Sequence, residues 1–434
     1  MSLSRRLPLV LIRSNRLNPR DLTQSELSSE SHSSEEDVEI LYEQIQEGCK
    51  PPVIARDVYP GTAADLFSNL HVRYPEEELH PEIRYMMFGK TPDQNVFLDP
   101  IITPAVLLNG EVTLGEPRQV IIVSGRDTYI TADRLTDYWQ EYARLKAFNS
   151  NRQNKDNVSP DRIWNSRRYM DTFKEWLTDA VTIYRQNHPH GEINFDSVDV
   201  KSAIIQVMFD RKVHVSQYRI TWVVSIIDYF RQFIRIESML DPFAGWGDRL
   251  IGAIKSEVSY EGFDPNKGLQ AGYKAMIDEL VPLTENGDKS EYSVTPVGFE
   301  TVTQFFRLEY DISFSSPPYG PVEFYEEGNP EQSTDKYITV NRRTGRADTR
   351  AWFTEFYFPA LTKAWSMIRA GGLMILQIGD TRTFKMVEET MTLFNKMEDC
   401  VPWGQFLTLA QLGKYPNLHL VYRKAGQGPY DTAI

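Results

Sequence analysis

Two turns that lie far apart in the sequence constrain the fold of this chain more than any other feature. The first runs from Asp241 to Arg249 and reads Asp-Pro-Phe-Ala-Gly-Trp-Gly-Asp-Arg, and the second is the tetrapeptide Ser316-Pro317-Pro318-Tyr319. Each follows a short run with apolar residues, which is the pattern of a buried strand that ends in a loop. Because parallel strands end at one edge of a sheet, the pair predicts a doubly wound α/β domain with both turns at that edge.

The spacing of apolar residues predicts the elements of this domain. Helical spacing resumes directly after the first turn, so its glycines lie between a strand and a helix. The expected strands lie near 237–241, 258–263, 291–297, 310–315 and 372–378, with a final pair at 405–411 and 417–423, and the expected helices at 247–256, 266–280, 352–369 and 384–398.

The first turn has the composition of a ligand-binding loop. Glycine at 245 and at 247 removes the Cβ atom and lets backbone approach a ligand closely. Asp264 ends the next expected strand, where a carboxylate can accept hydrogen bonds from ribose hydroxyls. The dinucleotide pattern is incomplete, because residue 250 is leucine rather than glycine. The loop therefore predicts a nucleoside-type cofactor, with a structural turn that binds nothing as the alternative.

The second turn suits the binding of an amino group. An exocyclic amine on a base is a poor nucleophile, because its lone pair is delocalised into the ring. The Ser316 hydroxyl and the Pro317 carbonyl can each accept one of its N–H bonds, and proline has no N–H and a fixed φ. Tyr319 offers a ring on which a base can stack, worth roughly 1–3 kcal/mol. The alternative is that the two prolines only end a strand.

With both turns in this order, the chain resembles the S-P-P-Y type of amino methyltransferase, which modifies N4 of cytosine or N6 of adenine, and in particular its phage and large-virus branch. The resemblance covers about Ser216 to Ala425, and its further marks are Asp264-Pro265-Asn266 and the Gly371-Gly372 pair before an apolar strand. It implies a Rossmann-like class I methyltransferase sheet, preceded here by a mixed β and helical N-terminal region. It also implies S-adenosylmethionine as the cofactor, with no metal.

The resemblance assigns roles to individual residues. In that family the first loop binds the methionine part of the cofactor, the acid after the second strand binds its ribose, and the S-P-P-Y turn binds the target amine. The implied cofactor-binding residues are Asp241, Pro242, Phe243, Ala244, Gly245, Gly247, Asp264 and Pro265, and the implied catalytic residues are Ser316, Pro317, Pro318 and Tyr319.

The function expected from the resemblance is methyl transfer to the amino group of a DNA base. Serine before Pro-Pro favours N4 of cytosine, although adenine enzymes of the S-P-P-Y type exist. Two alternatives remain open: an RNA base amino methyltransferase, and an inactive methyltransferase fold that serves as a scaffold or binding protein.

The two cysteines exclude other chemistries. A cytosine C5 methyltransferase needs a cysteine nucleophile after proline, and neither Cys49 nor Cys400 follows one. Two cysteines are also too few for a zinc site of soft ligands, and they indicate a reducing compartment.

Residues 8–12 are too short for a secretory signal, and no run approaches 18 apolar residues. We expect a soluble intracellular protein, in the cytoplasm or nucleus of a host, with no membrane partner.

The formal charge of −13 opposes broad affinity for nucleic acid, because phosphate contacts normally require a basic surface. Arginines nevertheless cluster after the second turn, inside an expected insertion at 320–351. We expect DNA, in preference to RNA, to contact this insertion. The expected contact residues are Tyr325, Arg342, Arg343, Arg346 and Arg350.

Composition shifts along the chain predict four regions. Residues 21–39 combine acids and serines without a base, which is typical of a disordered tail. The expected regions are a disordered basic-then-acidic tail at 1–50, a small strand-rich module at 51–131, a helical region at 132–215 and the catalytic domain at 216–434.

Overall fold

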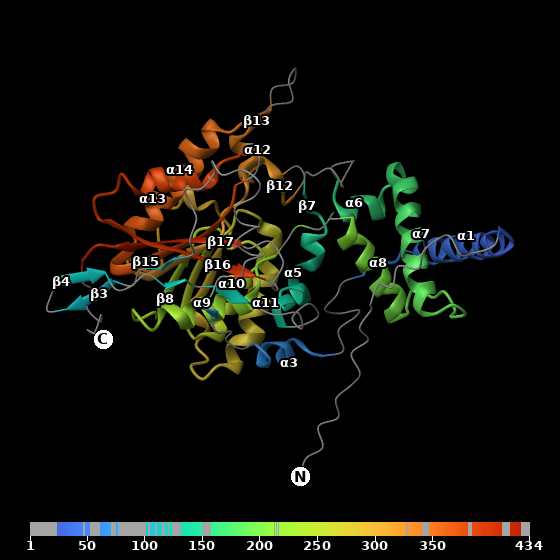
Figure 1. Ribbon diagram of the computed structural model, residues 1–434, viewed down its shortest axis with the longest axis horizontal. Helices are drawn as coiled ribbons and strands as arrows, with labels where there is room; N and C mark the ends of the chain where they lie inside the picture. Colours follow the sequence, from blue (N-terminus) through green and yellow to red (C-terminus); the bar gives the residue numbers. More distant parts are fainter. Residues whose placement is uncertain are drawn as a thin grey trace, which may run out of the picture.

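The structure is a computed structural model (Figure 1). It describes residues 24–426, except residues 47, 53–60, 71–74, 77–100, 103–104, 109–110, 115–117, 120, 124–131, 150–157, 212, 214, 216, 327–328, 341–346, 381–383 and 410–416.

The sheet of the C-terminal half confirms the expected doubly wound α/β class. Its strands lie in the order β10-β9-β8-β11-β15-β17-β16, and β17 is antiparallel to both neighbours while the others are parallel to one another. The bounds are β8 Ser238–Asp241, β9 Ser259–Phe263, β10 Tyr292–Thr295, β11 Tyr310–Ser315, β15 Ile368–Ile378, β16 Cys400–Leu409 and β17 Asn417–Lys424. Strand order reverses between β8 and β11, which is the point where such sheets bind ligands.

Helices cover both faces of this sheet. Helices α9 (Ile220–Phe230), α10 (Asp248–Lys255) and α11 (Gln270–Leu280) share one apolar core with alternate strand residues. Helices α13 (Phe358–Ser366) and α14 (Met386–Phe394) share another core on the opposite face. The two cores take alternate residues of β15, as expected for a strand buried on both sides.

A π-helical turn, Trp352–Tyr357, precedes α13 where the sequence predicts one continuous helix. Pro359 explains the change, because it has no N–H to donate to the carbonyl four residues earlier, at Glu355. The wider turn places Trp352 and Tyr357 in the core and Phe356 beside the cavity described below.

The strands expected to form a separate small module instead extend the large sheet of the C-terminal half. Strand β6 (Ile121–Val123) pairs with β16, and β1 (Pro75–Glu76) pairs with β6. Strand β2 (Ile101–Ile102) also pairs with β16, and β5 (Arg118–Gln119) with β2. Only the hairpin β3 (Ala105–Leu108) and β4 (Glu111–Leu114) is separate among the described strands of this region. Without these strands the outer edge of β16 would leave backbone N–H and C=O groups without partners, which explains why they are added there.

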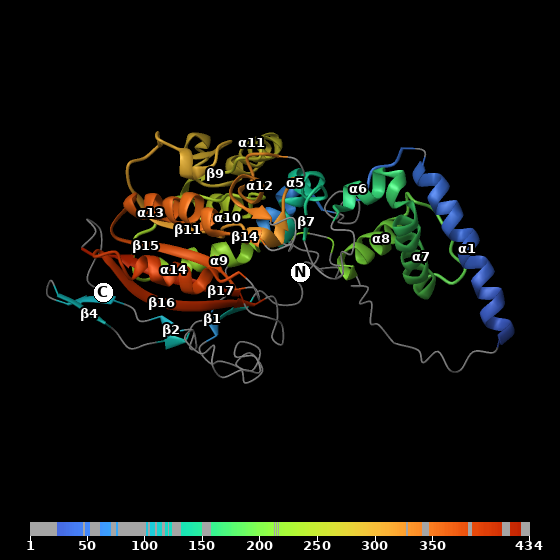
Figure 2. The same cartoon turned by 90° about the horizontal axis from the view of Figure 1, so that it is seen from above.

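The helices of the N-terminal half divide between two cores. Helices α3 (Ala63–Ser68) and α5 (Asp137–Arg144) pack on the C-terminal α/β domain. A second core joins α1 (Gln24–Gln46), α6 (Pro160–Asn165), α7 (Met170–Asn187) and α8 (Val198–Asp210). Figures 1 and 2 show these four helices gathered on one side of the large sheet.

The disordered tail expected through residue 50 is wrong for the residues that α1 covers. Val38, Leu41 and Ile45 have helical spacing and are buried against the second core. Asp37 forms an ion pair with Arg185 of α7 at 2.6 Å, so the negative charge of one acid of this segment is balanced within the fold. Residues 1–23, with their arginines, lie outside the described residues. No described helix is long and apolar enough to cross a membrane.

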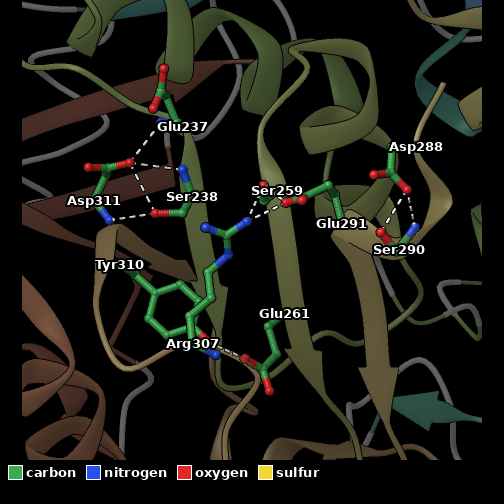
Figure 3. A network of polar contacts seen from close by, with 10 residues as sticks. All are labelled: Glu237, Ser238, Ser259, Glu261, Asp288, Ser290, Glu291, Arg307, Tyr310 and Asp311. Carbon is green, nitrogen blue, oxygen red and sulfur yellow. Dashed lines mark hydrogen bonds and ion pairs between the residues drawn. The ribbon is translucent and has the colours of Figure 1, made fainter. Parts of the chain in front are cut away.

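A polar network ties the strands together at their amino ends (Figure 3). One Asp311 carboxylate oxygen accepts the N–H groups of Glu237 and Ser238 at 2.8 and 2.9 Å, which links β11 to β8. Arg307 donates to Ser259 of β9 at 2.9 Å and also binds Glu291. This edge of the sheet is therefore closed by protein contacts, while the two turns lie at the opposite edge.

Candidate functional site

The two turns meet at the reversal of strand order. Ser315, the last residue of β11, donates its hydroxyl to the carboxylate of Asp241, the last residue of β8, at 2.5 Å. A cavity of about 320 Å³ is lined by residues of both turns. Trp246 of the first turn also lies against Tyr325, whose ring centroid is 5.9 Å away. Segments remote in sequence therefore form the walls of one cavity.

The first turn requires glycine at two positions. Gly245 and Gly247 have φ of 59° and 95°, which side chains rarely adopt. A Cβ atom at Gly247 would also come within 2.8 Å of the Met276 sulfur. Gly245 lines the cavity, so the bare backbone there faces the space a ligand would fill.

Asp264 lines the cavity and supports the glycine loop at the same time. Its carboxylate accepts the N–H of Gly245 at 3.1 Å and that of Asn266 at 2.8 Å. Burial raises the pKa of Asp264 to about 7, although these two hydrogen bonds oppose the rise. A carboxylate has about four acceptor positions, so two remain for ligand hydroxyls.

Asp241 has a different place from the one that the sequence predicts. It is fully buried, and it does not line the cavity. Its oxygens accept Arg249 Nε at 2.7 Å, the Tyr260 hydroxyl at 2.8 Å, the Phe243 N–H at 3.2 Å and the Ser315 hydroxyl. All four acceptor positions are thus used by the protein, so Asp241 supports the loop from within the core and has no acceptor position left for a ligand.

The other predicted loop residues divide in the same way. Pro242, Phe243 and Pro265 line the cavity, whereas Ala244 and Gly247 do not. Arg249 is buried beside Asp241: burial opposes its charge, but the carboxylate more than offsets this and raises its pKa. The ion pair fixes the loop from behind.

All four residues of the S-P-P-Y turn line the cavity. Burial raises the pKa of Tyr319, so its hydroxyl stays protonated. Gly379 lies beside this ring, and a Cβ atom there would be 3.6 Å from it, an ordinary van der Waals contact. Behind the turn, the Tyr325 hydroxyl donates to the carboxylate of Glu323. Tyr325 lines the cavity, as its expected contact with a substrate requires.

Tyr218, which precedes α9, also lines the cavity. Its hydroxyl lies 2.6 Å from Nε2 of the buried His419, whose pKa burial lowers to about 3. The neutral imidazole has its other nitrogen 3.3 Å from the Asn417 carbonyl, so Nδ1 carries the proton and Nε2 accepts from Tyr218.

Glu300 is a site residue that sequence reasoning missed. It lies on the 3-10 turn Phe299–Thr301, after β10, and it lines the cavity. Oε1 accepts the Tyr337 hydroxyl at 2.9 Å, whereas Oε2 is buried with no hydrogen-bond partner among the described residues. A buried acceptor without a donor is costly, so this oxygen suits a ligand N–H or O–H. The sequence signal that could have identified Glu300 is an acid after the third expected strand, because that strand ends at the same edge of the sheet as the strand before Asp264.

The charged side chains of the cavity wall are mostly acidic. Its cations, Arg219 and Arg249, already pair with Asp133 and Asp241 at 3.3 and 2.7 Å. The carboxylates that line the wall are those of Asp248, Asp264, Glu300, Glu323, Glu326 and Glu331. Such a wall favours a cation or a hydrogen-bond donor and disfavours phosphate.

The predicted nucleic-acid arginines are only partly within the described residues. Arg350 is exposed and binds Asp348 through Nε and Nη2, at 3.0 and 2.6 Å, and these bonds lower the pKa of Asp348 to about 2. Arg342, Arg343 and Arg346 lie outside the described residues. No group of three or more potential metal ligands occurs in the part of the chain that the structure describes.

No protein-family model and no curated protein matches this chain. Among solved structures, it is similar to an rRNA methylase from Streptococcus thermophilus, with 10% identity over 49% of this chain and 99% of that one and a TM-score of 0.31. It is also similar to the tRNA m1G37 methyltransferase of M. jannaschii, with 14% identity over 48% of this chain and 49% of that one and a TM-score of 0.27. A third similar structure is the magnesium protoporphyrin IX methyltransferase of Synechocystis with bound SAM, with 11% identity over 56% of this chain and 90% of that one and a TM-score of 0.30. Similarity at this level identifies neither a function nor a substrate for this chain.

Proposed function

We propose that this chain is an S-adenosylmethionine-dependent methyltransferase that acts on the exocyclic amino group of a nucleic-acid base. One observation carries the proposal: the glycine loop with Asp264 and the S-P-P-Y turn line the same cavity. A donor and an acceptor bound there would be held face to face, which is the main requirement of a direct displacement.

The residues at the glycine-loop end fit the proposed cofactor. Gly245 lets backbone approach the ligand, and Asp264 has acceptor positions left for ribose hydroxyls. Glu300 Oε2 would accept an N–H from the adenine amino group. When bound, S-adenosylmethionine supplies an electrophilic methyl group on a positively charged sulfur, a charge that the acidic wall favours.

The residues at the other end fit an amine. Ser316 Oγ and the Pro317 carbonyl would accept its two N–H groups and stabilise the positive charge that develops on nitrogen. Tyr319 would stack on the ring, and its raised pKa keeps its hydroxyl neutral there. Because the wall is acidic, the base would enter while its phosphates stay outside, as in a base flipped out of its stack.

DNA is the proposed substrate, with cytosine N4 favoured by the serine before Pro-Pro. RNA is the second candidate, and two observations favour it: the net charge of −13 and the pairing of Arg350 with Asp348 of its own chain. An unpaired RNA base is already unstacked, so less phosphate contact is needed to extract it.

Transfer of a labelled methyl group from S-adenosylmethionine to DNA and to RNA, followed by digestion to nucleosides, tests the proposal. We expect the label in N4-methylcytosine or N6-methyladenine from DNA, with Ser316→Ala as the inactive control. Label confined to RNA would select the second candidate. Absence of cofactor binding by calorimetry would reject both and leave a scaffold protein.

A further inference from the structure

Lys363 of α13 holds the turn that carries Glu300. Its ammonium donates to the carbonyl oxygens of Phe299 at 2.9 Å, Glu300 at 2.7 Å and Val302 at 2.9 Å. An ammonium has three N–H bonds, so all of them are used on this one turn. The ammonium also lies 5.4 Å from the centroid of the Phe299 ring. Lys363 itself does not line the cavity.

These three hydrogen bonds determine which way the turn faces. The negative ends of three carbonyl dipoles converge on one nitrogen, and without a cation there they would repel one another. The only other regular structure in the turn is a single 3-10 unit, Phe299–Thr301. The carbonyls of this turn point to α13, and Glu300 of the same turn lines the cavity.

Glu300 is held a second time at its carboxylate. The Tyr337 hydroxyl donates to Oε1, and the Lys336 ammonium lies 3.7 Å from the same oxygen. Both contacts leave Oε2 without a partner. The position of this oxygen is therefore fixed from two directions, by Lys363 through the backbone and by Tyr337 through the carboxylate.

We infer that Lys363 is a positioning residue that sets the selectivity of the cavity for the 6-amino group of a donor purine, by holding Glu300 Oε2 where that group binds. The inference rests on the proposed function. It concerns recognition of the donor base rather than the transfer step.

The chain provides a matched control in Lys424. Its ammonium donates to the carbonyl oxygens of Trp365, Ser366 and Ile368 at 3.1, 3.3 and 2.9 Å, at the other end of α13. Lys424 does not line the cavity. Lys424→Met therefore removes the same kind of three-carbonyl contact without touching the turn that carries Glu300.

The test compares binding of S-adenosylhomocysteine and S-inosylhomocysteine by calorimetry. The two compounds differ at position 6 of the purine, where an amino group donates and an oxo group cannot. Because a hydrogen bond to a charged group is involved, the wild-type chain should prefer the adenosine compound by roughly tenfold or more. Lys363→Met should reduce this preference to about twofold or less, whereas Lys424→Met should keep it, even where both variants lose similar thermal stability.

Each other outcome is decisive. A Lys363→Met variant that keeps the wild-type preference overturns the inference and leaves the proposed function intact. A wild-type chain that binds both compounds equally also overturns the inference and leaves the proposed function intact. A wild-type chain that binds neither overturns the proposed function as well. If Lys363→Met does not fold, Lys363→Gln replaces it, because glutamine retains a hydrogen-bond donor but no charge. The same ratio of affinities for S-adenosylhomocysteine and S-inosylhomocysteine then tests the inference.

Discussion

Replacing Asp241 with asparagine separates a supporting role from a cofactor contact. In the structure its carboxylate accepts four hydrogen bonds, from Arg249, Tyr260, Phe243 and Ser315. The asparagine amide has one oxygen and one NH₂ group. Some of the four hydrogen-bond donors would therefore face the NH₂ group, which cannot accept a hydrogen bond. Removing one partner of a buried ion pair costs about 3–5 kcal/mol, a large part of the 5–15 kcal/mol that typically stabilises a domain.

Denaturation and cofactor binding, measured on the same samples, check this prediction. Asp241→Asn should lower the free energy of unfolding by about 3–5 kcal/mol, while the protein that remains folded binds S-adenosylhomocysteine within about threefold of the wild type. Asp264→Asn is the matched control and should show the opposite balance, because Asp264 lines the cavity. An Asp241→Asn variant that unfolds like the wild type but has lost the ligand would refute the reasoning and restore the contact predicted from the sequence.

Three further predictions concern the two ends of the cavity. Ser316→Ala should lower kcat by about tenfold or more with an unchanged cofactor Kd, measured by steady-state kinetics and calorimetry; a change in Kd alone would show that the two ends have been exchanged. Cofactor affinity should fall as pH drops below about 7, because ribose hydroxyls donate to the ionised form of Asp264 and its pKa is raised to about 7. Asp264→Asn should abolish this dependence, and if it persists, Asp248, which lines the same cavity and also has a pKa of about 7, is responsible instead. Tyr337→Phe should weaken cofactor binding by about 1 kcal/mol through the lost hydrogen bond to Glu300, with acceptor KM unchanged; an effect confined to acceptor KM would contradict it.

The C-terminal sheet was predictable because its strands are short, apolar and followed by informative turns. The sequence predicts strands at 237–241 and 310–315, and the structure has them at Ser238–Asp241 and Tyr310–Ser315. Burial on both faces leaves an apolar signal that does not depend on the rest of the chain. The meeting of the two turns then follows from the order of the strands.

The errors have physical causes that one sequence does not reveal. Asp241 adjoins the glycine loop in the sequence, but the direction of its side chain depends on Arg249 and Ser315, which only the fold brings to it. Glu300 lies on a 3-10 turn without a small-residue loop to mark it. The sequence that forms α1 is rich in acids, so composition indicated disorder where Leu41 and its neighbours pack.

The insertion at 320–351 is expected from the sequence to read the acceptor, yet its described residues contact both ends of the cavity. Glu323 and Tyr325 stand behind the S-P-P-Y turn, while Tyr337 binds Glu300 at the proposed donor end.

Gln332 connects these two parts of the insertion. Its oxygen accepts the Tyr325 N–H at 3.2 Å, and its nitrogen donates to the Asp335 carboxylate in α12 (Ser333–Tyr337) at 2.7 Å. A ligand that orders Glu300 is therefore linked, through Tyr337, α12 and Gln332, to the residues behind Tyr319. Because one continuous set of contacts joins the two ends, changes in this insertion cannot be assigned to acceptor recognition by their location alone, and donor binding must be measured beside acceptor KM for every variant made in it.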